Sequence, residues 1–357
     1  MALQLIEWDG QPITRPGIYS GVPIETYHDD AMLFAGAPHI SSGGLRAIED
    51  PEGSLAHFWH GYVMNPDREK PEPGAHFSQG QACHTLFLGE DGFREKFIIR
   101  PETYTDDRGV EKPWSSNATI CKAWLKKQAD DGKTVLKAED LEAIKRMAAK
   151  LAAHPTIAAG LLNGLVEKSI FWFRDVVLED GQVQRVWLKA RPDVLTTDSH
   201  AVVDYKTCAS ADPMSVRRSI TDFGYHQQLA LIQEGLWEVA GHLTTDHYLV
   251  FQEKKEPYEI NIKPLFGSAI HVGHMQNARA LQRFAKCWAD REWPGYADDE
   301  CSCDLMEWRV KQLKEEIKDG RLNEDIILPG QIPHTPPPVA ALPAPKIAPA
   351  MPELEEV

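Results

Sequence analysis

Three consecutive segments in the middle of the chain are rich in β-branched and aromatic residues, which is typical of β-strands. They are SIFWFRDVVL (169–178), QVQRVWLKARPDVL (182–195) and AVVDYKT (201–207). The sequence Glu-Asp-Gly at 179–181 joins the first two as a hairpin turn, and Thr-Asp-Ser at 197–199 joins the second pair. The pattern therefore predicts a three-stranded meander.

Helical periodicity occurs on both sides of these strands. In AEDLEAIKRMAAKLAAHP (138–155) apolar residues recur every three to four positions, which predicts an amphipathic helix that ends near Pro155. Residues 100–118 have no such pattern and are expected to form an exposed loop. The other predicted elements are helices at 42–48, 78–88, 213–220 and 225–239, strands at 247–253 and 258–263, and a helix through about residue 288. This order predicts an α/β (α+β) fold with a central mixed sheet flanked by helices.

Length and composition are those of an ordinary globular protein. Of the 357 residues, 43% are hydrophobic and 25% are charged, which suffices for one large domain or two modest ones. Residues 1–78 are rich in Gly, Pro and His, and we expect an irregular, partly helical region that contributes to the core. Residues 321–357 are too rich in Pro and Ala to bury a core. We expect a disordered tail there, either dispensable or used to recruit a partner.

The net charge restricts the classes of function. Lys and Arg number 38 against 53 Asp and Glu, a formal charge of −15, which argues against a protein that simply coats DNA. An enzyme can still confine its cations to one channel. The chain has no long apolar run and no basic start followed by an apolar stretch, so we expect no membrane span, no secretory signal and a cytoplasmic location. The six cysteines lack metal-site spacing, and we expect them to be reduced.

Three charged residues carry the candidate chemistry. Asp204 and Lys206 are two apart in AVVDYKT, so they project from the same face of a strand. The turn at 197–199 would bring Asp193, at the end of the preceding strand, beside Asp204. Two carboxylates at one end of a sheet suit Mg2+, with Mn2+ as the alternative, and Lys206 would support phosphodiester hydrolysis. An Asp-x-Lys triplet alone would favour an exposed salt bridge, since the triplet occurs by chance in many chains, but here hydrophobic strands carry these charges.

Four segments together resemble the PD-(D/E)xK nuclease superfamily, within it the RecB-like group, and most closely the exonuclease VIII (RecE) type. They are GQACHTLFLG (80–89), KARPD (189–193), VDYKT (203–207) and YHQQLA (225–230). In order and spacing they span about residues 38–290. The resemblance implies a PD-(D/E)xK, restriction-endonuclease-like core, and it makes residues 79–320 the RecB-like nuclease domain.

The resemblance also implies roles for individual residues. Asp193 and Asp204 would be metal ligands, the backbone carbonyl of Tyr205 would add to the metal shell, and Lys206 would be the catalytic lysine. His84 fits the helical histidine of the group, which ligates or positions a metal, although a histidine beside two leucines also packs as a structural residue. The acidic member of VDYKT is Asp rather than the Glu of many relatives, which keeps a carboxylate ligand. No four-cysteine pattern is present, so no iron–sulfur cluster is expected.

Further residues are expected around this centre. Tyr225 and Gln228 are three apart on a predicted helix and look like the Tyr/Gln motif of the group, which positions DNA or the active-site lysine, although both also fit ordinary structural roles. Glu167 precedes the first strand and is a candidate accessory acid. Ser41 and Ser42, in HISSGGLRAIEDP, resemble the Ser-rich helix start of RecB-like nucleases and are candidates both for helix capping and for contact with DNA phosphate.

The implied activity is that of a phage-type or prophage-type recombination exonuclease. Such an enzyme digests linear duplex DNA from 5′ to 3′ and exposes a 3′ single strand for a RecT-like annealing protein. A homo-oligomer, with a tetrameric ring as the corresponding expectation, would let DNA ends meet only a basic channel in an acidic protein. Two alternatives remain: a RecB-like endonuclease or single-strand nuclease in repair or defence, and a protein that binds a DNA end or a recombination partner without cutting. Closed circular DNA separates an exonuclease from an endonuclease, and clustered carboxylates weigh against the binding protein.

Overall fold

A computed structural model of the chain describes residues 3–50, 53–69, 96–197, 200–296 and 306–321. The chain divides into two compact units, Met1–Ala297 and Asp298–Val357. In the described part of the second unit, helix α12 (Glu307–Lys318) carries an ion pair between Arg309 and Glu316. The predicted helix at 78–88 with His84, and residues 322–357 of the predicted tail, lie outside the described residues.

The first unit contains two five-stranded sheets, both of mixed strand direction. Sheet A has the order β1-β2-β9-β10-β3, and sheet B has the order β14-β13-β12-β11-β8. Sheet A consists of β1 (Leu5–Glu7), β2 (Gly17–Ser20), β3 (His39–Ser41), β9 (Ser169–Val177) and β10 (Val183–Ala190). Sheet B consists of β8 (Gly164–Val166), β11 (Val194–Thr196), β12 (Ala201–Cys208), β13 (Asp246–Glu253) and β14 (Ile260–Pro264).

The hairpin predicted at 179–181 is confirmed. Strands β9 and β10 are antiparallel from Val177 opposite Val183 to Ile170 opposite Ala190. Gly181 in the turn has a φ of 83°, a left-handed conformation that glycine adopts without a steric penalty. This hairpin forms the centre of sheet A.

The predicted three-stranded meander is wrong at its second strand. The segment 182–195 is broken at residues 191–193, and its two parts, β10 and β11, belong to different sheets. Pro192 lies in the break, and a proline has no backbone N–H to donate to a continuing ladder. Only the short β11 therefore pairs with β12, in antiparallel register from Val194 opposite Val203.

Strand β12 is buried on both faces of sheet B. Val202 belongs to a core cluster with Leu229 and Phe284, whereas Val203 and Tyr205 belong to a second cluster on the other face. On one side β12 pairs in parallel with β13, a connection that requires the intervening helices. Burial on both faces explains why this strand is nearly continuous in hydrophobic residues before Asp204.

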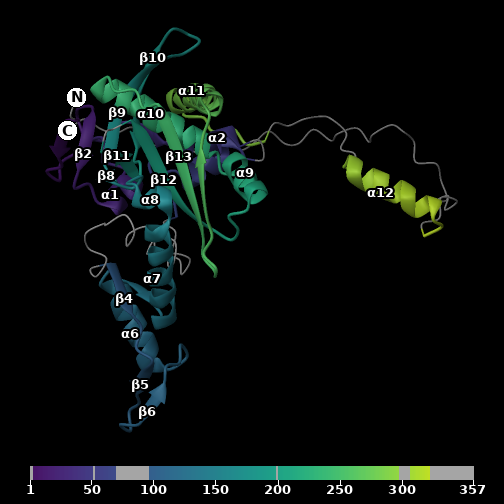
Figure 1. Cartoon of the computed structure of the whole chain (residues 1–357). Helices are drawn as coiled ribbons and strands as arrows, with labels where there is room; N and C mark the ends of the chain where they lie inside the picture. Colours follow the sequence, from purple (N-terminus) through teal and green to yellow (C-terminus); the bar gives the residue numbers. More distant parts are fainter. Residues whose placement is uncertain (1–2, 51–52, 70–95, 198–199, 297–305, 322–357) are drawn as a thin grey trace. The chain divides into compact units, whose positions relative to one another are not determined.

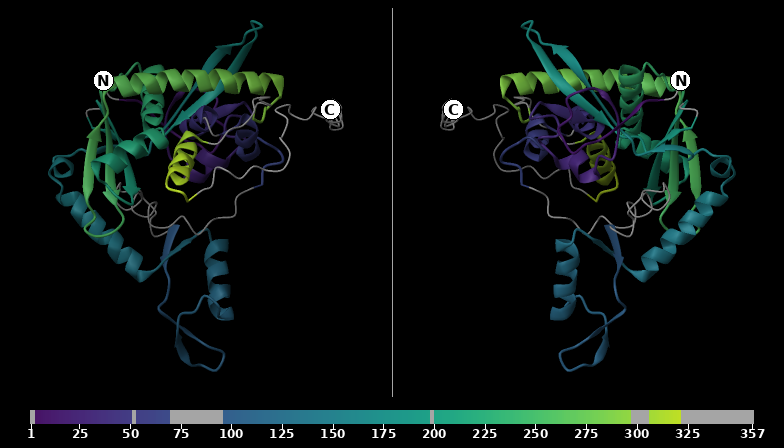
Figure 2. Two further views of the ribbon diagram at one scale, coloured as in Figure 1. Left: turned by 90° about the vertical axis from the view of Figure 1, so that its right-hand side faces the viewer. Right: turned by 90° about the vertical axis from the view of Figure 1, so that its left-hand side faces the viewer.

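Helices pack on both sides of the sheets. In Figures 1 and 2, α10 and the long helix α11 lie together along one side of the unit, and α11 contacts α2. Helix α7 packs its buried Ile144, Met147 and Leu151 against the other face of sheet B. Among the described residues of the first unit, the helices are α1 (Ile24–Asp29), α2 (Ser42–Glu49), α3 (Leu55–Gly61), α6 (Thr119–Asp130), α7 (Ala138–Ala153), α8 (Pro155–Ala158), α9 (Pro213–Asp222), α10 (Tyr225–Ala240) and α11 (Gly267–Asp290). These bounds confirm the predicted helices at 42–48, 138–155, 213–220 and 225–239 to within a few residues.

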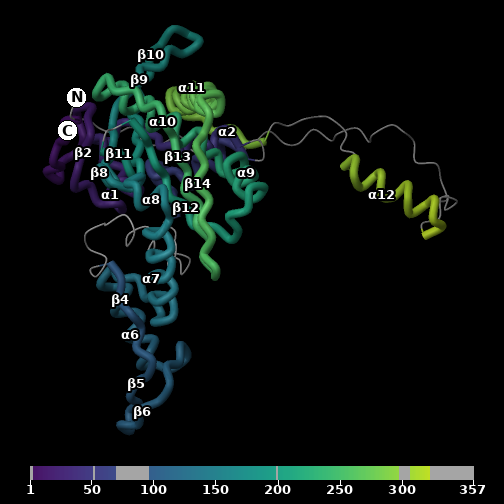
Figure 3. Tube along the Cα trace, viewed as in Figure 1, coloured from purple at the N-terminus to yellow at the C-terminus, as the bar shows by residue number. Residues whose placement is uncertain are grey.

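The tube in Figure 3 shows a smaller group of elements at the end of the unit away from α11. It contains α6 and two pairs of strands: β4 (Phe97–Ile99) with β7 (Thr134–Leu136), and β5 (Thr103–Thr105) with β6 (Glu111–Pro113). The predicted loop at 100–118 therefore contains a short exposed hairpin. Among the described residues, none of the helices combines the length and apolarity needed to cross a bilayer.

Candidate functional site

Strand β12 presents two charged side chains on one face of sheet B. Because side chains alternate along a strand, Asp204 and Lys206 face α10, whereas Tyr205 between them lies in the core beside α7. Nζ of Lys206 lies 2.7 Å from Oδ2 of Asp204. The Asp204 side chain is fully buried and that of Lys206 is 24% exposed. The predicted sharing of one face is confirmed.

Asp193 reaches the same place from the break between β10 and β11. It immediately precedes Val194, which pairs with Val203, so its backbone lies beside that of Asp204. Its Oδ2 accepts a hydrogen bond of 2.6 Å from the backbone N–H of Tyr205, and the residue is 8% exposed. Antiparallel pairing thus brings the two carboxylates together, as predicted, although at the end of the short β11–β12 ladder and in the middle of β12, not at an end of the sheet. Their role as metal ligands, with the Tyr205 carbonyl, stays a prediction.

Helix α10 covers this carboxylate pair with the two residues that the sequence places on one helical face. Nε2 of Gln228 donates a hydrogen bond of 2.8 Å to Oδ1 of Asp204. Nζ of Lys206 lies 5.1 Å from the centre of the Tyr225 ring, within the range of a cation–π interaction. Gln228 therefore contacts the carboxylate and Tyr225 contacts the lysine, and their role in positioning the site stays a prediction.

The surrounding charges keep Lys206 protonated. Burial by itself lowers the pKa of this ammonium, but the negative charges of Asp204 and Asp193 outweigh burial and raise the pKa above its ordinary value. Burial raises the pKa of the Tyr225 hydroxyl, with Lys206 acting against it. At neutral pH the cluster therefore contains a fixed positive charge and a neutral phenol.

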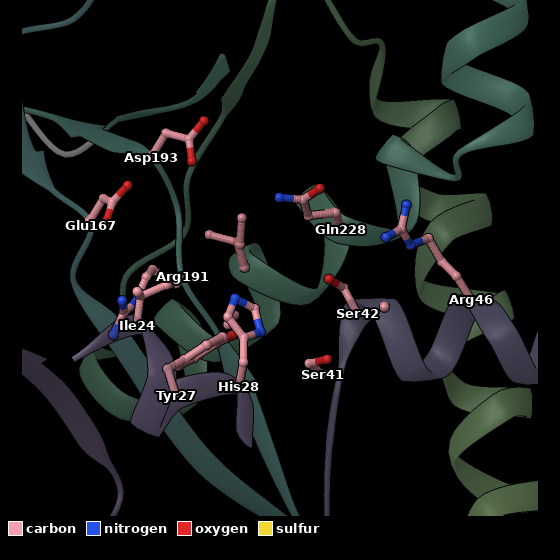
Figure 4. A pocket seen from close by; sticks show the side chains of 13 residues that line it. Ile24, Tyr27, His28, Ser41, Ser42, Arg46, Glu167, Arg191, Asp193 and Gln228 are labelled. Atoms are coloured by element: carbon pink, nitrogen blue, oxygen red, sulfur yellow. The ribbon is translucent and has the colours of Figure 1, made fainter. Parts of the chain in front are cut away.

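A cavity of ≈ 410 Å3 opens beside the cluster. Figure 4 shows Asp193 and Glu167 on one side of it, facing Gln228 across the space. Asp204 does not line the cavity. It accepts a hydrogen bond from Gln228, which does line the cavity. The polar side chains of the lining are those of Tyr27, His28, Ser41, Ser42, Arg46, Glu167, Arg191, Asp193 and Gln228.

Glu167 is held in an unusual backbone conformation. Its φ is 48°, a left-handed value that is uncommon for a residue other than glycine, and its N–H donates a 3.0 Å hydrogen bond to the carbonyl of Asp193. This bond fixes Glu167 beside Asp193 at the entrance to β9. The structure thus places the predicted accessory acid at the cavity, and its chemical role stays a prediction.

The start of α2 forms the opposite wall. Ser41 and Ser42 both line the cavity, and Ser41 occupies the N-cap position. The prediction that a serine side chain caps this helix is wrong, because Ser41 makes no side-chain cap hydrogen bond. The first turn of α2 thus borders the cavity with Ser41, Ser42 and Gly43, and hydroxyl groups and free N–H groups at a helix start suit an anion.

Arg46, one turn further along α2, connects this wall to α10. It donates a hydrogen bond to the carbonyl of Phe223, the residue before Gly224. Burial lowers the pKa of the Arg46 guanidinium, whereas Tyr225 and Asp204 raise it, so Arg46 lies within electrostatic reach of the carboxylate. Arg46 is thus a second positive charge, besides Lys206, near the buried Asp204.

Arg191 and His28 are candidate functional residues of the lining that the sequence did not predict. Arg191 is held by Ser169, at 3.0 Å from Nε and 2.6 Å from Nη2, and lies 4.6 Å from the centre of the Tyr27 ring. His28 lies on α1, and burial together with the charges of Lys189 and Arg191 lowers its pKa. The available signal for Arg191 was its place in KARPD, two residues before Asp193. The sequence contains no comparable signal for His28, because α1 reaches the cavity only through tertiary packing.

The donor atoms present fit a hard divalent cation in part. The carboxylates of Asp193 and Asp204 are the oxygen ligands that Mg2+ and Mn2+ take, and a cation would offset their closely placed charges. In the part of the chain that the structure describes, no three His, Cys, Asp or Glu side chains are arranged to hold a metal. The further predicted ligand, His84, lies outside the described residues.

Comparison with known proteins adds a family and a fold. The model of a family described as "PDDEXK-like domain of unknown function (DUF3799)" matches residues 61–306. Among solved structures, a "Putative exonuclease" from Eubacterium rectale gives a TM-score of 0.50 at 12% identity, covering 82% of this chain and 98% of that chain. The crystal structure of SSO0001, at 16% identity over 50% of this chain and 73% of that chain, has a TM-score of 0.24, too low to support an inference. No curated protein matches the chain. The predicted fold class, an α/β fold with mixed sheets flanked by helices, is confirmed.

Proposed function

The chain belongs to the family of PDDEXK-like domains of unknown function, and from this premise we propose that it is a metal-dependent DNA nuclease that hydrolyses phosphodiester bonds. The observation that carries the proposal is the cluster of Asp193, Asp204 and Lys206, which Gln228 connects to the cavity. A binding protein has no need to bury two carboxylates and a lysine together, since doing so without a function costs stability.

Asp193 and Asp204 would hold Mg2+ or Mn2+, which lowers the pKa of a bound water and offsets charge on the phosphate. Gln228 fixes the rotamer of Asp204 through its 2.8 Å hydrogen bond, so the carboxylate is oriented in advance. Lys206, kept protonated by Asp204 and Asp193, provides a positive charge for the attacking water or the leaving oxygen. Tyr225 limits the movement of that ammonium.

The opposite wall of the cavity would bind the substrate backbone. Ser41, Ser42 and Arg46 on this wall, together with Arg191 on the side of Asp193, offer hydroxyl, amide and guanidinium donors to phosphate oxygens. These local cations make a net charge of −15 compatible with DNA as substrate, because only the surface that meets the DNA has to be positive.

We further propose an exonuclease of the exonuclease VIII (RecE) type that digests linear duplex DNA from 5′ to 3′. The exposed 3′ strand would be passed to a RecT-like annealing protein, and the active form would be a homo-oligomer, such as a tetrameric ring. Support comes from the four segments that resemble that type and from the order and spacing of these segments. Glu167 would act as the accessory acid and His84 as an additional metal ligand.

The test is digestion of linear duplexes labelled at either the 5′ or the 3′ end, with and without Mg2+, beside a covalently closed plasmid. We expect metal-dependent release of the 5′ label first and an intact plasmid. Lys206→Ala and Asp204→Ala should each lower the rate by about a hundredfold or more, in line with the loss of a group that stabilises transition-state charge. Lys286→Ala, an exposed lysine on α11 paired with Asp290, is the matched control and should retain the full rate.

Each part of the proposal can fail separately. Cleavage of the closed plasmid would replace the exonuclease with an endonuclease, and early release of the 3′ label would reverse the polarity. Uncut duplex under Mg2+ with the wild-type protein would remove the enzymatic proposal altogether.

A further inference from the structure

A second cavity, of ≈ 350 Å3, adjoins the first. His28 and Ser41 line both cavities. A ligand bound in the first cavity is therefore adjacent to the second cavity. The second cavity lies between α2, α3 and the end of β10, and its lining includes His39, Phe58, Tyr62 and Lys189. Its volume is near the lower end of the range of about 300–1,000 Å3 for small-ligand pockets. It has the size for one nucleotide-sized ligand.

His39 provides a buried hydrogen-bond acceptor in this lining. The residue is 1% exposed, and its Nδ1 lies 3.2 Å from the carbonyl of Ala37, which can only accept. Nδ1 therefore carries the proton, and Nε2 of the neutral ring is an acceptor. Burial, aided by Lys189, lowers the pKa of His39 to about 3, in keeping with a neutral ring. No group of the described residues forms a hydrogen bond with Nε2.

The other side chains of the lining provide donors and an aromatic surface. Lys189 is 4% exposed and donates one hydrogen bond of 2.5 Å to the carbonyl of Tyr27. Whether charged or neutral, the amino group keeps at least one further proton for a ligand. Phe58 is partly buried, and its ring stacks on Tyr62 with centres 5.1 Å apart and planes at 28°. An aromatic wall with an acceptor and a donor is a combination that binds a nucleobase by stacking and edge contacts.

We propose that the second cavity binds the nucleoside attached to the phosphate in the first cavity. This inference rests on the proposed nuclease function and specifies its substrate. A base inside such a cavity cannot remain paired or stacked in a duplex, so the enzyme would take its substrate as an unpaired nucleotide. The requirement for an unpaired nucleotide favours strand ends, which open more easily than internal base pairs. His39 and Lys189 would read the base edge, and Phe58 would stack on its face.

The first experiment measures binding of mononucleotides, which contain no phosphodiester bond to hydrolyse. Wild-type protein with Mg2+ is titrated calorimetrically with dAMP, deoxyribose 5-phosphate and inorganic phosphate. We expect dAMP to bind about tenfold or more tightly than deoxyribose 5-phosphate, which lacks the base. Ala47→Trp, which fills the cavity from its exposed rim, should abolish this preference. His39→Phe, which removes the acceptor and keeps a ring, should reduce it independently.

Ala278→Trp is the matched control, because Ala278 is an exposed alanine of α11 outside both cavities. It should leave the preference unchanged. Equal affinities for dAMP and deoxyribose 5-phosphate in the wild type would overturn the inference. So would a preference that persists in both Ala47→Trp and His39→Phe, because the base would then bind elsewhere.

A second experiment separates this inference from the proposed function. On linear duplexes with an abasic terminal nucleotide, kcat/KM of the wild type should fall by about the same tenfold factor, with no such fall in Ala47→Trp. An uncut duplex together with a dAMP preference that Ala47→Trp abolishes would refute the nuclease and keep the base site. Normal cutting that does not distinguish abasic from ordinary ends would refute the base site and keep the nuclease.

Discussion

Gln228 donates a hydrogen bond of 2.8 Å from Nε2 to Oδ1 of Asp204, and Lys206 approaches the other oxygen of the same carboxylate. Asp204 is the fully buried member of the cluster, so both of its oxygens are oriented by neighbours rather than by solvent. Because Gln228 also lines the cavity, it connects the buried carboxylate to the space where a substrate would bind. The hydrogen bond between Gln228 and Asp204 joins α10 to β12. Its removal by mutation is the most direct test of how the site is organised.

Replacement of Gln228 by alanine should lower DNA cleavage roughly 10- to 100-fold, the usual cost of removing a group that orients a metal ligand. Gln228→Glu should be worse, because it places a second negative charge against Asp204. Initial rates on linear duplex measure both effects, and circular dichroism checks the fold. Gln282→Ala, an exposed glutamine of α11 bonded to the Val177 carbonyl, is the control. A Gln228→Ala enzyme with the wild-type rate would exclude this positioning role.

Glu167 allows removal of a carboxylate without adding backbone strain. Its φ of 48° suits asparagine and glycine better than glutamate. We therefore expect Glu167→Asn to match or exceed the wild type in free energy of unfolding, while cleavage falls about tenfold if a proton-transfer group is lost. Urea denaturation and initial rates give the two quantities. Full activity in Glu167→Asn and in Glu167→Gly would show that Glu167 is no accessory acid.

Gly224 and Gly241 form a matched pair at the two ends of α10. Both are left-handed, with φ of 58° and 59°, so alanine is strained at either position by about 1 kcal/mol. A Cβ at Gly224 would also lie 2.7 Å from Cδ of Arg46 and 2.8 Å from Oε1 of Gln227, whereas at Gly241 nothing lies within 4 Å. Gly224→Ala should cost about 2 kcal/mol or more in total.

Gly224→Ala should in addition lower the cleavage rate, because the clash displaces Arg46 and the start of α10, which carries Tyr225. Chemical denaturation and initial rates compare the two variants. Equal losses of stability in Gly224→Ala and Gly241→Ala would mean that the contact with Arg46 is readily relieved.

The lowered pKa of Lys189 predicts a specific dependence of the free energy of unfolding on pH. Burial lowers its pKa from 10.5 to about 7 in the folded protein, Arg191 acts in the same direction, and Asp29 and Asp30 oppose it. Between pH 7 and 10 the unfolded chain therefore binds a proton that the folded chain does not, so this residue makes stability rise with pH. The rise is about 1.4 kcal/mol per pH unit at most, and below pH 7 the full penalty is present.

Lys189→Met removes the titrating group and keeps an unbranched apolar side chain. Urea denaturation at several pH values should show that the wild type gains stability relative to the variant as pH increases from 7 to 10. Lys286→Met provides the control with an exposed lysine. A constant difference between wild type and Lys189→Met across this range would contradict a neutral, buried Lys189.

The sequence by itself determined the local features of this protein. Alternation along β12 was enough to place Asp204 and Lys206 on one face, and helical spacing was enough to place Tyr225 beside Gln228. The turn at 179–181 was predictable from its residues alone. Each of these inferences depends on neighbours within a few positions, where backbone geometry fixes the direction of side chains.

Only the tertiary structure decided how the segments meet. Pro192 divides one predicted strand between two sheets, Arg46 bonds to the distant Phe223, and His28 reaches the cavity from α1. The burial of Lys189 likewise depends on α1 packing against β10. Such contacts join residues that are far apart along the chain, and their energies depend on shape, burial and local charge in the folded state. A single sequence specifies them but displays no periodic pattern from which they can be read.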